Sequence, residues 1–364
     1  MSRTRRRFPT IDDVAARCGV ATSTVSRAFS RPERVSAATR ELILATAAAM
    51  GYRPNPIARA LPSGRTLTLG LLVPDITNPF FLPLIRGAER RAAEAGYTLV
   101  LSDTEESPAQ EATAFDRLHG SVDGYILASS RQSDDDLRRA HERSPLVVVN
   151  RRIPPVPGVV IDSAGGVLEA VRHLAELGHR RIGYLAGPAT SWSNAQRWEA
   201  LSAATQRLRL EVVRLSSIVP TIEGGEAAAD AVLAADITAL VTFNDLLAIG
   251  LVRELGARSV PLPDRLSIVG CDDIFGADFC TPALTTLTAP VESAGRAAVD
   301  LLLDRVFTTA GVDDPDRVPG SVPAVVTVPT RLTIRQSTRA VPEATRETAE
   351  ATREVPKEQA EGIE

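Results

Sequence analysis

Aromatic side chains are scarce in this chain of 364 residues, at 4%, with only two tryptophans. Hydrophobic residues still make up 44%, enough for two or three domains whose cores consist of Ala, Val, Leu and Ile. No apolar run approaches the roughly 20 residues that cross a bilayer, so we expect no membrane segment. No hydrophobic segment follows the basic start MSRTRRRFPT, so we expect no secretory signal and a cytoplasmic protein.

Cysteines and the common catalytic motifs are also missing or few. The three cysteines, Cys18, Cys271 and Cys280, are odd in number and far apart, without metal-ligand spacing. We interpret them as small buried hydrophobic side chains in a reducing compartment. The sequence contains no phosphate loop, no Gly-x-Ser-x-Gly elbow and no histidine pair at helical metal spacing. We therefore expect no enzymatic activity, no cofactor and no metal site.

Charge is divided unevenly along the chain, although the net charge is only −4. Residues 1–65 contain twelve arginines against four acidic residues, whereas the remainder contains 29 basic and 41 acidic side chains. A basic head on an acidic body is typical of a protein that meets nucleic acid at one end. A solvated basic tail would account for the first four arginines alone and not for the other eight.

Three short helices are predicted within residues 1–54. Thr10 caps the first helix, and Asp13 lies three residues later, where its carboxylate reaches back. Gly19 stands where that helix ends, and a second helix follows over residues 22–30. Ser36 caps a third helix. This order predicts an all-α helix-turn-helix domain that binds DNA.

The second helix of such a domain enters the major groove of DNA. Thr22, Ser23 and Thr24 open this helix, where short polar side chains reach base edges. Arg27 lies one turn further on, and its guanidinium can bind a guanine through two hydrogen bonds. The alternative is a three-helix bundle with an exposed polar face, but this does not account for the basic charge and the turn glycine.

Residues 55–65 predict a short helix and linker. Asn55 is a capping residue and Pro56 suits the first helical position. A helix of about two turns is not stable alone in water, so we infer that it folds when a partner helix and DNA are present. An inert linker is the alternative.

The pattern changes to alternating strands and helices over residues 66–336. Continuous apolar strands such as LTLGLLVPD and RRIGYLAG are separated by amphipathic helices. This pattern predicts an α/β domain with parallel sheets covered on both faces, which bind ligands at the carboxyl ends of their strands. Residues 337–364 are rich in Ala, Thr and Glu, and we expect them to be disordered.

Several of these segments resemble the LacI–GalR family of transcription regulators. The resemblance spans residues 10–65 and about 67–335, and its most specific blocks are TVSR, GYRPNPIARAL, LGLLVPDITNPFF, HLAELGHRRIGYLAG and LSIVGCDD. It implies a two-lobe, periplasmic-binding-protein-like sensing domain behind the DNA-binding head. It also implies a regulator, most often a repressor, that binds a pseudo-palindromic double-stranded operator as a homodimer and responds to a small sugar-like effector.

The resemblance also implies site residues. In the predicted hinge, Asn55 and Arg59 would contact DNA, and Leu61 would insert into the minor groove and bend the duplex. In the sensing domain, the implied ligand contacts are Asn78, Phe80, Phe81, Asn150, Arg151, Trp192, Arg197, Asn244 and Asp272. Such amides, carboxylates, guanidinium groups and rings suit a sugar. A Trp at position 192 is more often part of a core than a ligand platform.

Some residues depart from the family pattern. Ala21 stands where the family usually has a capping Ser, and Asn150 stands in place of a common Asp. Pro220 and Ala289 replace a frequent aromatic residue and a frequent Gln. A regulator with a vestigial pocket under the control of a partner protein therefore remains an alternative, as does a transport-type sugar-binding module. The tail lacks the leucine heptads that make tetramers in the lactose repressor, which favours a dimer.

Overall fold

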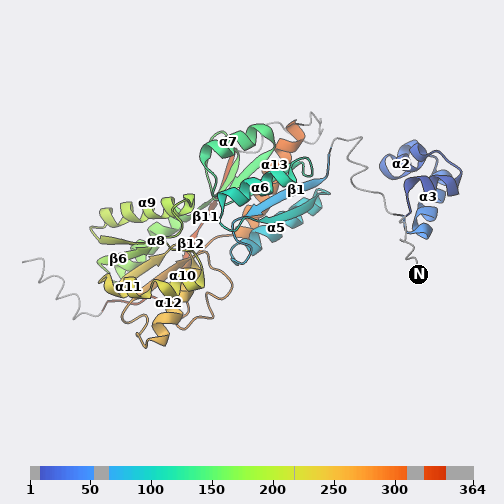
Figure 1. Cartoon of the computed structure of the whole chain (residues 1–364). Helices are drawn as coiled ribbons and strands as arrows, with labels where there is room; N and C mark the ends of the chain where they lie inside the picture. Colours follow the sequence, from blue (N-terminus) through green and yellow to red (C-terminus); the bar gives the residue numbers. More distant parts are fainter. Residues whose placement is uncertain (1–8, 53–64, 217, 310–323, 342–364) are drawn as a thin grey trace, which may run out of the picture. The chain divides into compact units, whose positions relative to one another are not determined.

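Two compact units make up the chain, Met1–Leu67 and Thr68–Glu364. The computed structural model describes residues 9–52, 65–216, 218–309 and 324–341 (Figure 1). Within these ranges no helix is both long and apolar enough to cross a membrane. Most of the predicted hinge, including Asn55, Arg59 and Leu61, lies outside the described residues.

The first unit contains the three predicted helices. Its elements are α1 (Ile11–Cys18), α2 (Thr22–Ser30), the 3₁₀ turn η1 (Pro32–Arg34) and α3 (Ala37–Met50). The capping box forms as predicted, because the hydroxyl of Thr10 accepts from the Asp13 amide while the Asp13 carboxylate accepts from the Thr10 amide at 2.8 Å. Gly19 ends α1 in the left-handed conformation, with φ of 65°, which a residue without Cβ adopts at little cost.

A small apolar core holds these helices together. Its buried members come from all three helices and are Val14, Ala15, Val25, Ala28, Ile43 and Ala47. Most are small or β-branched, so the helices approach closely, and the rings of Phe29 and Tyr52 pack against this core with their centroids 6.0 Å apart.

Two six-stranded sheets form the second unit, as the alternating pattern predicted. The first sheet, in the order β11-β5-β4-β3-β1-β2, contains β1 (Thr68–Val73), β2 (Thr98–Asp103), β3 (Gly124–Ala128), β4 (Leu146–Val149), β5 (Gly158–Asp162) and β11 (Val325–Pro329). The second, in the order β12-β10-β9-β8-β6-β7, contains β6 (Arg181–Leu185), β7 (Glu211–Leu215), β8 (Ala239–Thr242), β9 (Ser267–Cys271), β10 (Thr285–Thr288) and β12 (Arg331–Thr333). All pairings are parallel except that of β10 with β12.

Each sheet with its helices is one lobe. Lobe 1 contains α5 (Phe81–Glu94), α6 (Pro108–Leu118), α7 (Asp134–Arg143) and α13 (Val291–Thr309). Lobe 2 contains α8 (Ser163–Glu176), α9 (Trp192–Arg207), α10 (Ile222–Ala227), α11 (Ala229–Ala234) and α12 (Asp245–Ala257). The chain crosses between the lobes three times, from β5 into α8, from β10 into α13, and from β11 into β12. Three crossings confirm the two-lobe arrangement that the family resemblance implied.

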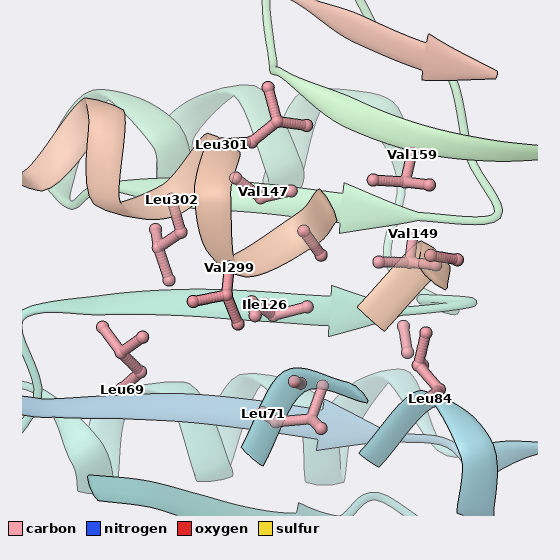
Figure 2. Close-up of a cluster of buried hydrophobic side chains, with 14 of the residues drawn as sticks. Leu69, Leu71, Leu84, Ile126, Val147, Val149, Val159, Val299, Leu301 and Leu302 are labelled. Carbon is pink, nitrogen blue, oxygen red and sulfur yellow. The ribbon is translucent and has the colours of Figure 1, made fainter. Parts of the chain in front are cut away.

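Helix α13 covers one face of the lobe 1 sheet next to α5. Figure 2 shows Val299 and Leu302 of α13 above Ile126 of the central strand β3. Glycines allow the two helices to approach, because a Cβ at Gly87 would lie 2.0 Å from a backbone oxygen of α13. A Cβ at Gly295 would lie 2.2 Å from the Leu84 carbonyl oxygen. This close packing makes lobe 1 a rigid support for the loops at the carboxyl edge of its sheet.

The body continues beyond residue 336, where we expected the disordered tail to begin. Ser337 is 1% exposed, and its hydroxyl donates to the carbonyl of Ile268 at 2.6 Å. The amide of Val341 donates to the Leu177 carbonyl at 2.9 Å. Residues 337–341 thus pack on lobe 2, and the predicted boundary was too early because composition does not show backbone pairing. Residues 342–364 lie outside the described residues.

Candidate functional site

Helix α2 exposes the polar side chains that the sequence predicted to meet DNA. Thr22, Ser23 and Arg27 are exposed at its surface. Val25 and Ala28 lie on the opposite side, buried against the other two helices. The helix therefore presents one polar, basic face to solvent, as a helix that enters the major groove must.

The amino terminus of α2 lacks a side-chain cap. Ala21 has an extended backbone, with ψ of 149°, and forms no capping hydrogen bond with its methyl group. Its carbonyl accepts from the amide of Thr24, a half-buried residue, at 2.8 Å. The absence of a side-chain cap, expected from an alanine at this position, is confirmed. A Ser, Thr, Asp or Asn cap would add about 1 kcal/mol to helix stability.

A cavity in the second unit collects side chains from both lobes. Its lining consists of Asn78, Phe80, Phe81, Glu106, Ser129, Arg131, Asn150, Ser191, Ser193, Arg197, Pro220, Phe243, Asn244 and Asp272. Its free volume is about 30 Å³, and a single water needs roughly 10–15 Å³, so the lobes leave room for a few waters. We call this cavity the interlobe cleft.

The positions of these residues follow from the parallel sheets. Asn78 follows β1 and Asn150 follows β4 in lobe 1, while Asn244 follows β8 and Asp272 follows β9 in lobe 2. The carboxyl ends of parallel strands lie at one edge of a sheet, so the loops that follow them gather there. Seven of the nine predicted ligand residues thus line one cleft.

Arg197 and Asp272 form an ion pair at the lobe 2 side of the cleft. Arg197 Nη2 donates to Asp272 Oδ1 at 3.1 Å, and both side chains are 8% exposed. Arg197 Nη1 donates to the carbonyl of Phe243, and the guanidinium carbon lies 5.1 Å from the centre of the Phe243 ring. Within the described residues, the buried Nε of Arg197 has no hydrogen-bond partner. The guanidinium is thus held in one orientation and keeps one donor unused.

Burial perturbs the carboxylates next to this arginine. Burial raises the pKa of Asp272 to about 6, although the charge of Arg197 opposes the shift. Burial, together with the nearby charge of Asp272, raises the pKa of Asp245 to about 7. Asp245 is fully buried and accepts from the Thr286 hydroxyl at 2.6 Å and from the Ile274 amide at 3.0 Å. Carboxyl groups with raised pKa values gather where a protein binds ligands or performs chemistry.

The backbone of Asp272 is strained, with φ of 119°. A non-glycine residue rarely adopts this conformation, and such residues cluster at ligand sites because the surrounding structure must hold them there. Asn150, on the lobe 1 side, has φ of 58°, in the left-handed region that asparagine tolerates better than most residues. The surrounding fold, and not the intrinsic backbone preference of the residue, therefore sets the conformations of Asp272 and Asn150 at the junction of the lobes.

All three lining amides are engaged within the protein, and on the lobe 1 side Asn150 Nδ2 donates to Ser129 Oγ at 3.3 Å. Asn78 Oδ1 accepts from the Phe80 amide at 3.0 Å. Asn244 caps α12, where its Oδ1 accepts from the Leu247 amide at 3.0 Å, and its Nδ2 donates to the Pro220 carbonyl at 3.0 Å. These bonds fix the orientation of the three amides before any ligand arrives, which reduces the entropy lost on binding.

Two predicted ligand residues lie outside the cleft. Arg151 is 7% exposed, and its guanidinium donates to the Ser130 carbonyl at 2.9 Å and to Asp134 at 2.7 Å. It therefore holds the loop after β3 and does not reach the cavity. Trp192 is half-buried at the start of α9 and does not line the cleft. Neither side chain lines the cleft, since a side chain next to a cleft residue in sequence can point into the protein.

Sequence reasoning missed several lining residues. Arg131 forms two hydrogen bonds with Glu106, from Nε at 2.5 Å and from Nη2 at 3.0 Å. The others that we did not predict are Ser129, Ser191, Ser193 and Phe243. Most lie in loops directly after strands, so the position of a polar residue after a buried strand was a signal that would have found them.

Comparison with known proteins agrees with this architecture. Residues 10–55 match the model of bacterial regulatory proteins of the lacI family, and residues 171–338 match a periplasmic binding protein-like domain. The HTH-type transcriptional repressor CytR of Escherichia coli K12 is 34% identical over 343 residues, 92% of this chain and 97% of the relative. The regulator DegA of Bacillus subtilis is 33% identical over 297 residues, 79% of this chain and 88% of the relative.

A solved structure extends this likeness to the fold. The lac repressor dimer bound to operator and an anti-inducer matches with a TM-score of 0.81 at 25% identity, over 92% of this chain and all of that chain. Sequence and structure therefore agree from the head to the second lobe. The chain belongs to the lacI family of bacterial regulatory proteins and is a transcription regulator whose binding to DNA is modulated by a ligand.

Proposed function

We propose that this chain represses transcription by binding a pseudo-palindromic operator as a homodimer, and that a small polyhydroxylated ligand in the interlobe cleft changes its affinity for the operator. The relatives that support repression carry repressor names, among them the ribose operon repressor of Escherichia coli K12. The lac repressor structure supports a dimer on operator DNA. The role is regulatory and not catalytic, and its place is the cytoplasm.

The observation that carries the proposal is the convergence of polar side chains from both lobes on one cavity. Arg197, Asp272 and Asn244 come from lobe 2, and Asn78 and Asn150 come from lobe 1. A ligand that bonds to both sets favours the closed arrangement of the lobes over an open one. Ligand binding is thereby linked to the angle between the lobes.

The chemistry of the lining favours a sugar or a sugar-containing metabolite. Guanidinium, carboxylate and amide groups bind adjacent hydroxyls, and the rings of Phe80 and Phe81 supply an apolar surface for the C–H face of a sugar. Two relatives of known structure support this class, since a lacI-family regulator from Enterococcus faecium contains bound ribose and CelR contains cellobiose. Pro220 offers no aromatic ring for stacking at its position, so the cleft need not accept a common hexose or pentose.

Calorimetry against a panel of pentoses, hexoses, disaccharides and nucleosides tests the ligand class. An operator is first selected from random duplexes with the full-length protein. One class of compound should bind in the calorimeter and change operator affinity by 5–150-fold, the range that a coupling of about 1–3 kcal/mol produces. If no compound binds and operator affinity stays constant, the ligand proposal fails and control by a partner protein takes its place.

A further inference from the structure

A second and larger cavity lies in lobe 1, between α6 and α7. Its free volume is about 220 Å³, and none of its lining residues belongs to the interlobe cleft. Its apolar surface comes from Ala112, Phe115, Leu127 and Leu137. The ring of Phe115 stacks on Tyr125 at 4.1 Å between centroids, so this wall is fixed by the core beneath it. We call this cavity the α6–α7 pocket.

A buried carboxylate, that of Glu111, lies in the wall of the α6–α7 pocket. The residue is 3% exposed, and it accepts from the Ser130 hydroxyl at 2.5 Å and from the Arg131 amide at 3.0 Å. Burial raises the pKa of Glu111. In the described residues no arginine or lysine forms an ion pair with it. A carboxylate has about four acceptor sites, so two remain for a donor that enters the pocket.

The other charges of the pocket compensate one another. Arg139 pairs with Asp136, and Arg143 lies 3.7 Å from Asp116. Among the described lining residues, Glu111 is the charged side chain that forms no ion pair, although the charges of Arg131 and Arg151, outside the pocket, partly offset the effect of its burial. A buried carboxylate in an apolar setting is costly unless a cation or several donors compensate it. An entering group with a positive charge and N–H donors would supply both.

We propose that the α6–α7 pocket is a second ligand site, which binds a planar apolar ring bearing a cationic N–H donor group such as an amidine or a protonated aminoheterocycle. The ring lies against Phe115 and Leu137, and the donor group bonds to the carboxylate of Glu111. The volume of about 220 Å³ is suited to a ligand of one or two rings. The proposal rests on lobe 1 alone and is independent of the ligand proposed for the interlobe cleft.

One loop joins the α6–α7 pocket to the interlobe cleft. Residues 129–132 follow β3, and Glu111 bonds to Ser130 and to the backbone of Arg131 from the pocket side. On the cleft side, Ser129 and the side chain of Arg131 line the cavity. A ligand that engages Glu111 thus orders the loop that carries two cleft residues. The second site is placed to modulate the first.

Benzamidine is a suitable probe because it combines a planar ring with a cationic donor group. Calorimetry on the full-length chain should detect its binding, while benzoate, with the same ring and the opposite charge, should not bind. Glu111→Gln should weaken benzamidine binding at least tenfold. The matched control is Glu142→Gln, which removes an exposed carboxylate of α7 outside the pocket and should bind as the wild type does.

A second variant tests the role of the cavity apart from that of the Glu111 carboxylate. Ala112 lines the pocket at an exposed position, so Ala112→Leu should fold normally and block binding while Glu111 is retained. Hydrogen exchange of residues 129–132 should slow on addition of benzamidine in the wild type and in Glu142→Gln only. Absence of binding to the wild type, or equal binding to Glu111→Gln and Glu142→Gln, overturns the site. Unchanged exchange in the loop overturns its link to the cleft.

Discussion

At the scale of single residues, the pair of Arg197 and Asp272 joins the energetics of the fold to the proposed ligand chemistry. Both side chains are 8% exposed, so each has lost most of its hydration. A buried pair is weak evidence for stability, but removal of one partner leaves the other as an uncompensated charge. Because Arg197 and Asp272 both line the interlobe cleft, the pair is placed to meet a ligand there.

The first prediction concerns Asp272→Asn, which keeps the shape of the side chain and removes its charge. The variant should bind operator as the wild type does, because the DNA-binding head is a separate unit, and should lose its response to the effector. Arg197→Ala should have the same effect on the response and should also lower stability, because it leaves the buried carboxyl of Asp272 without its partner. Titration of operator affinity against effector concentration measures the response. Asp236→Asn, an exposed carboxylate at the opposite end of β8, is the matched control. A wild-type dose response in both cleft variants would place the ligand elsewhere.

The second prediction concerns the buried carboxyl of Asp245. Burial raises its pKa to about 7 in the folded chain, above the ordinary value of 3.8, so between these pH values the folded state holds a proton that the unfolded state has released. Its contribution to stability is therefore present at low pH and is lost as pH rises from about 4 to about 7. Asp245→Asn carries no such proton and should remove this slope.

Urea unfolding at pH 5 and at pH 8 measures the effect as a difference between wild type and variant, which cancels the other titrating groups. The wild type should exceed Asp245→Asn in stability by more at pH 5 than at pH 8. A difference that is constant over this range, or that grows with pH, would show that Asp245 is ionised in the folded chain throughout.

At the scale of elements, the head and the sheets were predictable because their signals are local. The capping box at Thr10 and the glycine at position 19 set the two ends of α1. The apolar strands β3 and β4 of the body are buried on both faces, as parallel sheets require. The strap of residues 337–341 was missed because its bonds to Ile268 and Leu177 join segments far apart in the sequence. The direction of Arg151 was missed for the same reason.

Helix α2 carries the third prediction, through Arg27. Arg27→Ala should cost about 1–3 kcal/mol on the selected operator and relax the base preference at one position in each half-site. The residue is exposed, so the fold should not change. Binding to the operator and to a pool of single-base variants, at one salt concentration, measures both effects. Arg17→Ala, an exposed arginine of α1, serves as the control for charge alone. If Arg27→Ala weakens binding to operator and to random DNA equally, Arg27 contacts only the phosphate backbone.

At the scale of the whole molecule, three connecting segments join the two lobes. Such connections permit the angle between the lobes to change while the core of each lobe remains packed. Most buried side chains of each lobe pack within that lobe, while Ile274, Leu246 and Ile249 of lobe 2 also pack against the lobe 1 core at the junction. Ligand chemistry at the junction is therefore linked to the arrangement of the lobes more than to their internal packing. The family resemblance implied the two lobes and seven of the cleft residues, while the lining by Glu106 and Arg131 became visible only in the structure.

The fourth prediction separates the two parts of the carboxyl-terminal region. Truncation after Val341 should leave a dimer by light scattering and leave operator affinity unchanged, because residues 342–364 contain no leucine heptad. Truncation after Gln336 should instead lower the melting temperature. It removes the bonds of Ser337 to Ile268 and Thr285, at 2.6 and 2.8 Å, and leaves buried polar groups of lobe 2 without partners.

Light scattering and thermal unfolding of the two truncated chains, next to the full-length protein, provide the measurement. The substitution Ser337→Ala is the matched control for the longer truncation, since it removes the hydroxyl and keeps the backbone bonds of the strap. It should lower the melting temperature by less than truncation after Gln336 does. If the full-length protein is a tetramer that becomes a dimer when residues 342–364 are removed, the prediction of a full-length dimer is wrong. An unchanged melting temperature after removal of residues 337–364 would show that the strap contributes nothing to lobe 2.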